Sequence, residues 1–180
     1  MLEGSQPRSE DAFQRLLLKF SAAAAEGTDA ASLIRLFCGA TREFFQVDGV
    51  YFWKCLSKEE LIGAEADGLM AEGFRGTPLK ATESAVAADA VRNRKTVYVN
   101  HVDSRRYGMA AEFRAQSLMS APLIVSSEVI GAAVFLHTSD RTFTEDDAAK
   151  ATILAGQLGC LLYTSPSPRD RTRSRMPSSA

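Results

Sequence analysis

The sequence predicts an α+β fold, in which helices pack on a mainly antiparallel sheet of about five to six strands. Helical and strand patterns follow one another in the order α-α-β-β-loop-α-β-α-β-β-α. Strand patterns come as adjacent pairs joined by short turns, at 50–56 with 61–65 and at 117–125 with 129–137. Hairpins at both ends of a sheet favour antiparallel pairing, and one sheet with its helices fits a chain of 180 residues.

Two helices are predicted before the first strand. Ser9 is a polar cap followed by two acids, and apolar residues recur at helical spacing up to about Ala25. Gly-Thr-Asp at 27–29 ends this helix and caps a second one. The apolar set of the second helix is Leu33, Ile34, Phe37, Ala40, Phe44 and Phe45.

The middle of the chain begins with the hairpin of 50–56 and 61–65, whose first strand is rich in β-branched and aromatic residues. Glycine and proline make residues 67–81 a loop. Thr82 is a candidate cap for a helix that runs to about Arg94.

The second half starts with a strand at 96–102 and a short, irregular helical stretch at 103–116. The second hairpin follows, and its strand at 129–137 is apolar on both faces, which places it inside the sheet with cover on each side. Thr144, with three acids after it, begins the last helix.

Composition excludes several classes of protein. The 21 basic and 22 acidic side chains nearly cancel, so no overall positive field attracts nucleic acid. We find no apolar run approaching the roughly 20 residues of a membrane span and no signal-peptide segment, which favours the cytoplasm. Three widely spaced cysteines, Cys38, Cys55 and Cys160, suit reduced thiols better than a disulfide framework.

Residues 160–180 differ from the rest in being rich in Ser, Pro and Arg. Their codons can be written as a string that resembles a transposase-type sequencing adapter, and we expect a non-native, disordered tail here. The predicted organisation is a flexible segment at 1–10, a domain at 11–159 and this tail at 160–180. On this interpretation the natural protein continues beyond Gly159 into an output region.

Three segments resemble the GAF domains, small sensory modules of signalling proteins, and the likeness covers about residues 11–159. Residues 117–136 look like the family's small-residue-Pro-Leu strand, its turn and its Val-Ile-Gly strand. Phe143-Thr144 with Asp147 is similar to the family's entry into the last helix. Val102-Asp103, followed by Arg-Arg-Tyr, looks like its loop after a strand.

The resemblance implies that the terminal helices cover one face of the sheet, while short helices and loops roof a small-molecule pocket on the other. The candidate ligand-binding residues are Trp53, Tyr98, Asn100, His101, Arg105, Tyr107, Ser120 and Phe135. Each also has an ordinary explanation: His101 as a strand-end histidine, Arg105 as a solvated loop residue, and Trp53 as a core aromatic.

The sequence motifs give little support for phosphate binding, nucleophilic catalysis or metal binding. The sequence has no Gly-x-x-x-x-Gly-Lys-Ser/Thr phosphate loop, no Gly-x-Ser-x-Gly elbow and no Cys or His pair at metal-ligand spacing. The signature of cyclic-nucleotide GAF domains is not visible, and His101 has no nearby cysteine for attachment of a bilin. We expect no metal and no covalent chromophore, and the ligand stays unidentified.

The sequence therefore predicts a non-enzymatic, small-molecule-binding input domain of a larger bacterial signalling protein. We expect a ligand to bias helix packing in a homodimer formed through Phe13, Leu16, Phe20, Ile153 and Leu158. One alternative is an enzyme similar to the GAF-fold reductases of free methionine sulfoxide, although the cysteines are not clustered in loops as in that family. The other is a ligand-free dimerisation scaffold.

Overall fold

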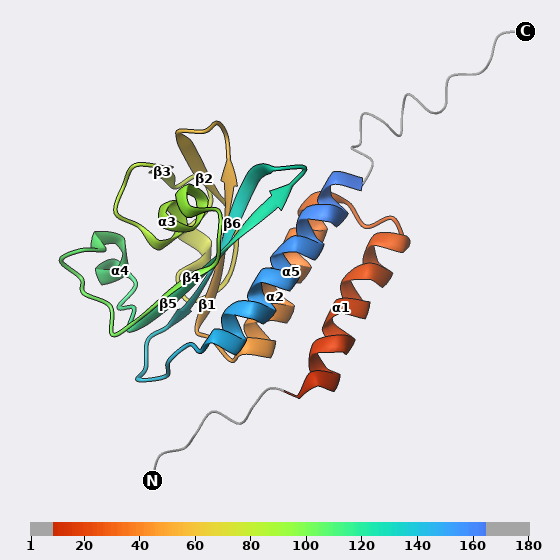
Figure 1. The fold of residues 1–180 in the computed structure, drawn as a ribbon, viewed down its shortest axis with the longest axis horizontal. Helices are drawn as coiled ribbons and strands as arrows, with labels where there is room; N and C mark the ends of the chain where they lie inside the picture. Colours follow the sequence, from red (N-terminus) through yellow and green to blue (C-terminus); the bar gives the residue numbers. More distant parts are fainter. Residues whose placement is uncertain (1–8, 165–180) are drawn as a thin grey trace, which may run out of the picture.

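The computed structural model describes residues 9–164, which form one sheet with helices on both faces (Figure 1). The helical elements are α1 (Glu10–Ala25), α2 (Ala30–Phe45), η1 (Ala71–Gly73), α3 (Val86–Asn93), α4 (Gly108–Glu112) and α5 (Glu145–Thr164). The strands are β1 (Gly49–Cys55), β2 (Glu60–Gly68), β3 (Pro78–Lys80), β4 (Val97–Asn100), β5 (Ser117–Val125) and β6 (Glu128–His137). The predicted α+β class and element order are confirmed, with η1 and β3 added inside the predicted loop.

The six strands lie in the order β3-β2-β1-β6-β5-β4, and all five neighbouring pairs are antiparallel. β6 is flanked by β1 and β5, as its continuous apolar pattern predicts. β1 and β6 approach closely at Gly131, where a Cβ atom would lie 2.5 Å from the carbonyl oxygen of Trp53. A glycine is therefore needed at this point of the sheet.

The terminal helices form the first of two hydrophobic cores. α2 and α5 pack on the sheet, and α1 packs on their outer side (Figure 1). Phenylalanines dominate the centre: Phe20 of α1 and Phe37 of α2 have ring centroids 5.5 Å apart, and Phe45 meets Phe135 of β6 at 5.0 Å. All four side chains are fully buried, so this side of the sheet is closed by the chain itself.

The residues that we expected to form a dimer interface mostly belong to this core. Phe13, Leu16, Phe20 and Leu158 are at most 7% exposed, because the apolar stripes of α1 and α5 face their own domain. Of the five, Ile153 is the one that is exposed. The prediction that the other four contact a second copy is wrong, because the terminal helices use them intramolecularly.

The opposite face of the sheet carries α3, α4, η1 and the loops that join them (Figure 1). α3 begins at Val86 and not at Thr82 as predicted, and its N-cap residue Ala85 makes no side-chain capping bond. The segment before it is a turn, held by the guanidinium of Arg92, which donates to the carbonyl oxygens of Ala81 and Glu83. Arg92, near the end of the helix, thus fixes the turn before α3, and the expected threonine cap does not form.

The last helix extends beyond the predicted domain boundary. α5 continues through residues 160–164, five residues past the point where we expected a disordered tail to begin. The rest of that predicted tail, 165–180, and most of the predicted N-terminal segment, 1–8, lie outside the described residues.

Candidate functional site

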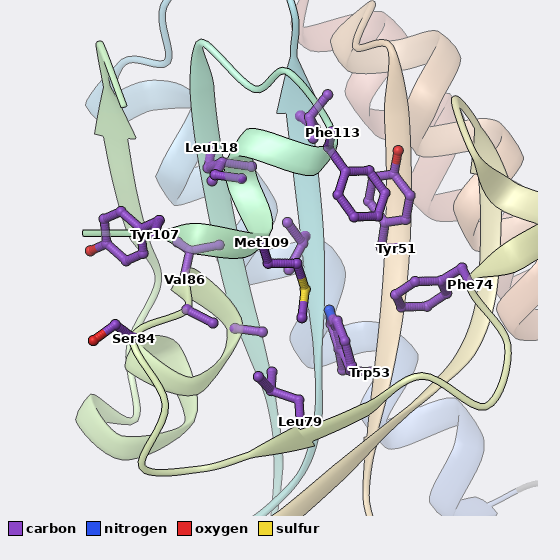
Figure 2. A pocket seen from close by; sticks show the side chains of 15 residues that line it. Tyr51, Trp53, Phe74, Leu79, Ser84, Val86, Tyr107, Met109, Phe113 and Leu118 are labelled. Carbon is purple, nitrogen blue, oxygen red and sulfur yellow. The ribbon is translucent and has the colours of Figure 1, made fainter. Parts of the chain in front are cut away.

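A cavity of about 50 Å³ lies between the sheet and the short helices that cover it (Figure 2). Its floor is formed by side chains of β1, β5 and β6, namely Tyr51, Trp53, Leu118, Val134 and Leu136. Its roof and sides come from the segments around η1, β3, α3 and α4, namely Phe74, Leu79, Ser84, Ala85, Val86, Ala87, Tyr107, Met109, Ala110 and Phe113. The cavity therefore lies on the face of the sheet where the resemblance predicts a pocket.

Four aromatic rings form one continuous group along this cavity, which we call the aromatic cluster: Tyr51, Trp53, Phe74 and Phe113 (Figure 2). The ring centroid of Tyr51 lies 5.3 Å from that of Phe74 and 5.0 Å from that of Phe113, and Trp53 lies 4.8 Å from Phe74. All three pairs are edge-to-face, a favourable arrangement for aromatic side chains.

The two tyrosines that line the cavity have their hydroxyl protons committed to other groups. The hydroxyl of Tyr51 donates to the carbonyl oxygen of Leu69 at 2.5 Å, and that of Tyr107 donates to Asp89 Oδ2 at 2.9 Å. Burial is the main cause that raises the pKa of both phenols; a nearby carboxylate, Asp48 for Tyr51 and Asp89 for Tyr107, adds to it. Both phenols stay neutral at physiological pH, so neither places a negative charge in the cavity.

A second, larger hollow of about 350 Å³ adjoins the cavity. Its lining shares Phe74, Met109 and Phe113 with the first cavity. These three side chains therefore form the wall between the two spaces, and two of them come from α4 or the residue that follows it. Movement of Met109, an unbranched and flexible side chain, would join the two spaces.

The segment that contains α4 is bounded by two residues in a left-handed backbone conformation. His101 has φ of 57° and Arg114 has φ of 53°. Non-glycine residues seldom adopt this conformation, and such strained positions often occur at functional segments. The roof over the cavity is thus a short helix joined to the sheet through two strained residues.

The structure brings two of the eight sequence-predicted residues, Trp53 and Tyr107, to the cavity. Ser120 is fully buried on the same face, because its cross-strand partner Val134 lines the cavity, but Ser120 itself does not. Its Oγ has no hydrogen-bond partner among the described residues. His101 and Arg105 are exposed on the loop before α4.

The other three predicted residues lie on the opposite side of the sheet. Phe135 and Tyr98 pack in the core under the terminal helices. Asn100 binds the backbone of Phe143, whose N–H donates to Asn100 Oδ1 and whose carbonyl oxygen accepts from Nδ2, both at 2.9 Å. Asn100 therefore fixes the entry to α5, and none of these three residues lines the cavity.

Strand alternation is the signal that could have found more of the lining. Tyr51 is two residues from Trp53 on β1, so both side chains point to the same face of the sheet. Val134 and Leu136 flank Phe135 on β6 and therefore point to the face opposite to Phe135, which is the face that carries the cavity. No comparable pattern marks Phe74, Met109 or Phe113, because they lie in irregular segments whose path is set by tertiary packing.

The cysteines do not form a reactive group. Cys38 is buried in the core under the helices, whereas Cys55 packs with residues of the opposite face. Burial is the main cause that raises the pKa of both thiols, which lowers the thiolate fraction on which nucleophilicity depends. Within residues 9–164, no three His, Cys, Asp or Glu side chains are grouped as metal ligands would be, and no helix is long and apolar enough to cross a membrane.

Comparisons with solved structures find the same fold. A GAF domain of a phosphoenolpyruvate-protein phosphotransferase from Coxiella burnetii has a TM-score of 0.75 at 15% identity, over 93% of this chain and 100% of that one. Free methionine-R-sulfoxide reductase from Neisseria meningitidis, in complex with its substrate, has a TM-score of 0.74 at 21% identity, over 96% and 99%. The phycoerythrobilin-bound GAF domain of a cyanobacterial phytochrome has a TM-score of 0.71 at 16% identity, over 85% and 95%.

No curated protein sequence matches the chain. At these identities the structural likenesses establish the fold alone. The family model described as GAF domain, however, matches residues 27–162, which span α2 to α5 and every element around the cavity. Because this match covers well over half of the sequence, the chain belongs to the GAF domain family.

Proposed function

We propose that this GAF domain is a non-enzymatic input domain of a larger bacterial signalling protein, in which it binds a small molecule and regulates an output region. The observation that carries the proposal is the cavity lined by fifteen side chains under a roof of short elements, beside a core that is otherwise closed. Concave, mostly apolar sites of this kind are typical of small-molecule binding. Three free cysteines suit a reducing compartment, and we propose the cytoplasm.

The route from the cavity to the terminal helices starts at β4, which connects the two roof helices α3 and α4 in the chain. Both ends of this edge strand are bonded to the α5 region. Thr96 Oγ1, just before β4, lies 2.6 Å from Thr152 Oγ1 of α5, and Asn100 at its end holds Phe143 as described above. A shift of the roof would therefore act on α5 at Thr152 and on the segment that leads into α5 at Phe143.

The mechanism is a shift of population between two positions of the roof. A ligand that binds better when α4 is displaced favours that state by its difference in affinity for the two states. β4 then transmits the displacement to α5. This helix is the last of the described elements, and we propose that it passes the displacement to the output region.

Homodimerisation through the terminal helices remains part of the proposal, with a surface different from the one first expected. Two exposed aliphatic residues there are Leu18 on α1, 68% exposed, and Ile153 on α5, 51% exposed. Sedimentation equilibrium of the wild type and of L18E/I153E tests this: we expect a dimer that the double substitution dissociates. A monomeric wild type would contradict it.

The alternative of a methionine sulfoxide reductase is not favoured, because Cys38 and Cys55 lie on opposite faces of the sheet and burial raises the pKa of both. We expect no turnover of free methionine sulfoxide with a thiol reductant. Turnover that disappears in C55S would instead establish the enzyme.

Native mass spectrometry of the protein purified from cells tests whether the cavity is occupied. Ala110 of α4 lines the cavity and is 6% exposed, whereas its neighbour Ala111 is exposed. We expect a bound small molecule on the wild type and on A111L, and at least about tenfold less on A110L, because leucine fills the cavity. Equal occupancy of all three, or none after exposure to extracts of cellular small molecules, would favour the ligand-free scaffold.

A further inference from the structure

We propose that the cavity selects an uncharged aromatic molecule of one or two rings that carries a hydrogen-bond acceptor, such as a carbonyl oxygen, for the indole N–H of Trp53. This inference rests on the proposed function, namely that the cavity binds a small molecule. It adds the chemical class of that molecule.

The lining excludes charge. None of the fifteen side chains around the cavity is a carboxylate, an amine, a guanidinium or an imidazole. The two phenols keep their protons, for which burial and nearby carboxylates are responsible. An anion placed here would lose its hydration without gaining a counter-charge. A cation would gain only cation–π contacts with the rings, because the one carboxylate among the residues that line the two spaces, Glu112 of the adjoining hollow, is exposed to solvent.

The aromatic cluster favours a flat ring. Its three ring contacts are edge-to-face, and Figure 2 shows Tyr51 and Phe113 at one end of the cavity and Trp53 with Phe74 farther along β1. A planar ligand between them can make the same kind of contact with several rings at once. Each such pair contributes to binding beyond the burial of its area.

Trp53 supplies the polar requirement. The side chain is 3% exposed, and Figure 2 shows its indole nitrogen on the edge turned toward Met109. Among the hydrogen bonds of residues 9–164 there is none from this N–H, whereas the hydroxyls of Tyr51 and Tyr107 both have acceptors. Since an indole nitrogen only donates, the ligand has to bring the acceptor.

The dimensions limit the ligand to a small number of rings. An apolar cavity of about 150 Å³ holds one benzene molecule, so the closed cavity of about 50 Å³ is too small for a ring. When Met109 and Phe113 move, the cavity joins the neighbouring space of about 350 Å³. The combined space is large enough for one or two rings with a short substituent.

Four probes of similar size separate the requirements: acetophenone, which is neutral with an acceptor; ethylbenzene, which is neutral without one; benzoate; and phenyltrimethylammonium. Trp53 is the only tryptophan of the chain, so its fluorescence reports binding at the cavity itself. We expect acetophenone to bind about fivefold more tightly than ethylbenzene, as one net hydrogen bond predicts, and at least about tenfold more tightly than either ion.

The substitution W53F assigns the acceptor preference to this residue, with ligand-observed NMR as the readout because the fluorophore is lost. Phenylalanine keeps a ring but removes the donor. We expect the fivefold preference for acetophenone over ethylbenzene to disappear while ethylbenzene keeps its affinity within about twofold. F113L, at the half-buried edge of the roof, is the second variant, and it should weaken both neutral probes alike.

The outcomes separate this inference from the proposed function. Benzoate or phenyltrimethylammonium binding as tightly as acetophenone, an unchanged preference in W53F, or no binding of any probe overturns the inference. If the native mass spectra nevertheless show a cellular ligand on the wild type that is lost in A110L, the domain remains a small-molecule sensor, but for another class of ligand. If both experiments fail, the sensory function fails as well.

Discussion

The two faces of the sheet are built from different side chains. Under α1, α2 and α5 the core contains large residues such as Phe20, Phe37 and Phe45, all fully buried. On the other face α3 contributes the alanines of its sequence VAADAVRN, and α4 is only five residues long. Small side chains on short helices leave a space above a floor of large ones, whereas interlocking large side chains leave none. The cavity thus follows from composition, and the comparison predicts how each face tolerates substitution.

The largest effect is expected from truncating the closed core. F37A removes a side chain that is 0% exposed and should lower the free energy of unfolding by about 3–5 kcal/mol. F113A, at the half-buried edge of the cavity, should cost about half as much, because about half of this ring is already in contact with solvent. Urea unfolding measures both, and equal losses would show that the two faces are packed alike.

Enlarging an alanine on each face gives the converse comparison. A121L inserts three carbons on the helix-covered face of β5, where Ala121 is 0% exposed, and should cost about 1–3 kcal/mol through overpacking. A110L places the same atoms at the cavity and should cost less than about 1 kcal/mol, because the space already exists. Thermal unfolding of the two variants tests this, and a larger loss in A110L would mean that the cavity is not available.

The pH dependence of stability sharpens the comparison further. Burial raises the pKa of Tyr51, so above about pH 10 the unfolded state releases this proton while the folded state retains it. Stability conferred by Tyr51 is therefore complete below about pH 10 and falls as the pH rises above that value.

The variant Y51F should cost about 0.5–1.5 kcal/mol at neutral pH, because it removes the bond to Leu69, and the difference from wild type should narrow in alkali. Y163F, at an exposed position of α5, is the control and should leave the profile unchanged. A gap that stays constant above pH 10 would show that Tyr51 ionises as easily in the folded state as in the unfolded one.

The smallest effect concerns the connection between the faces. T152V removes the contact of α5 with Thr96 and should cost less than about 1 kcal/mol. It should nevertheless reduce the change in hydrogen exchange of α5 that acetophenone produces, without changing the affinity for acetophenone. T164V is matched to it, since both hydroxyls also bond within α5 but Thr164 has no contact with the roof. An undiminished response in T152V would exclude this route.

The sequence predicted the elements of this fold well because their signals are local. Caps at Ser9 and Asp29 and the apolar spacing after them define α1 and α2, and two apolar runs joined by a short turn define β5 and β6. Thr82 predicts too early a start for α3, because the segment is a turn held by Arg92 from the far end of the helix, which no local pattern shows. β3 is three residues long and exists only because β2 pairs with it.

The site was harder to predict than the fold. Chemistry alone groups Tyr98 and Asn100 with Trp53, although their side chains lie on the other side of the sheet. The face that each strand residue occupies depends on register, which the sequence specifies only through its neighbours. The lining is also mostly apolar, and nothing in the sequence around Phe74 or Met109 distinguishes a residue that lines a cavity from one that packs in a core.

The order of the strands also bears on how the protein avoids aggregation. The sheet ends on both sides in its two shortest strands, β3 with three residues and β4 with four. β3 begins with Pro78, which has no N–H to offer, and Thr96 and Asn100 at the ends of β4 are bonded to α5 and its entry. The long apolar strand β6 pairs with β1 on one side and with β5 on the other, and β4 covers Ser117–Ser120 of β5, which limits the backbone at which another chain could add a strand and start a fibril.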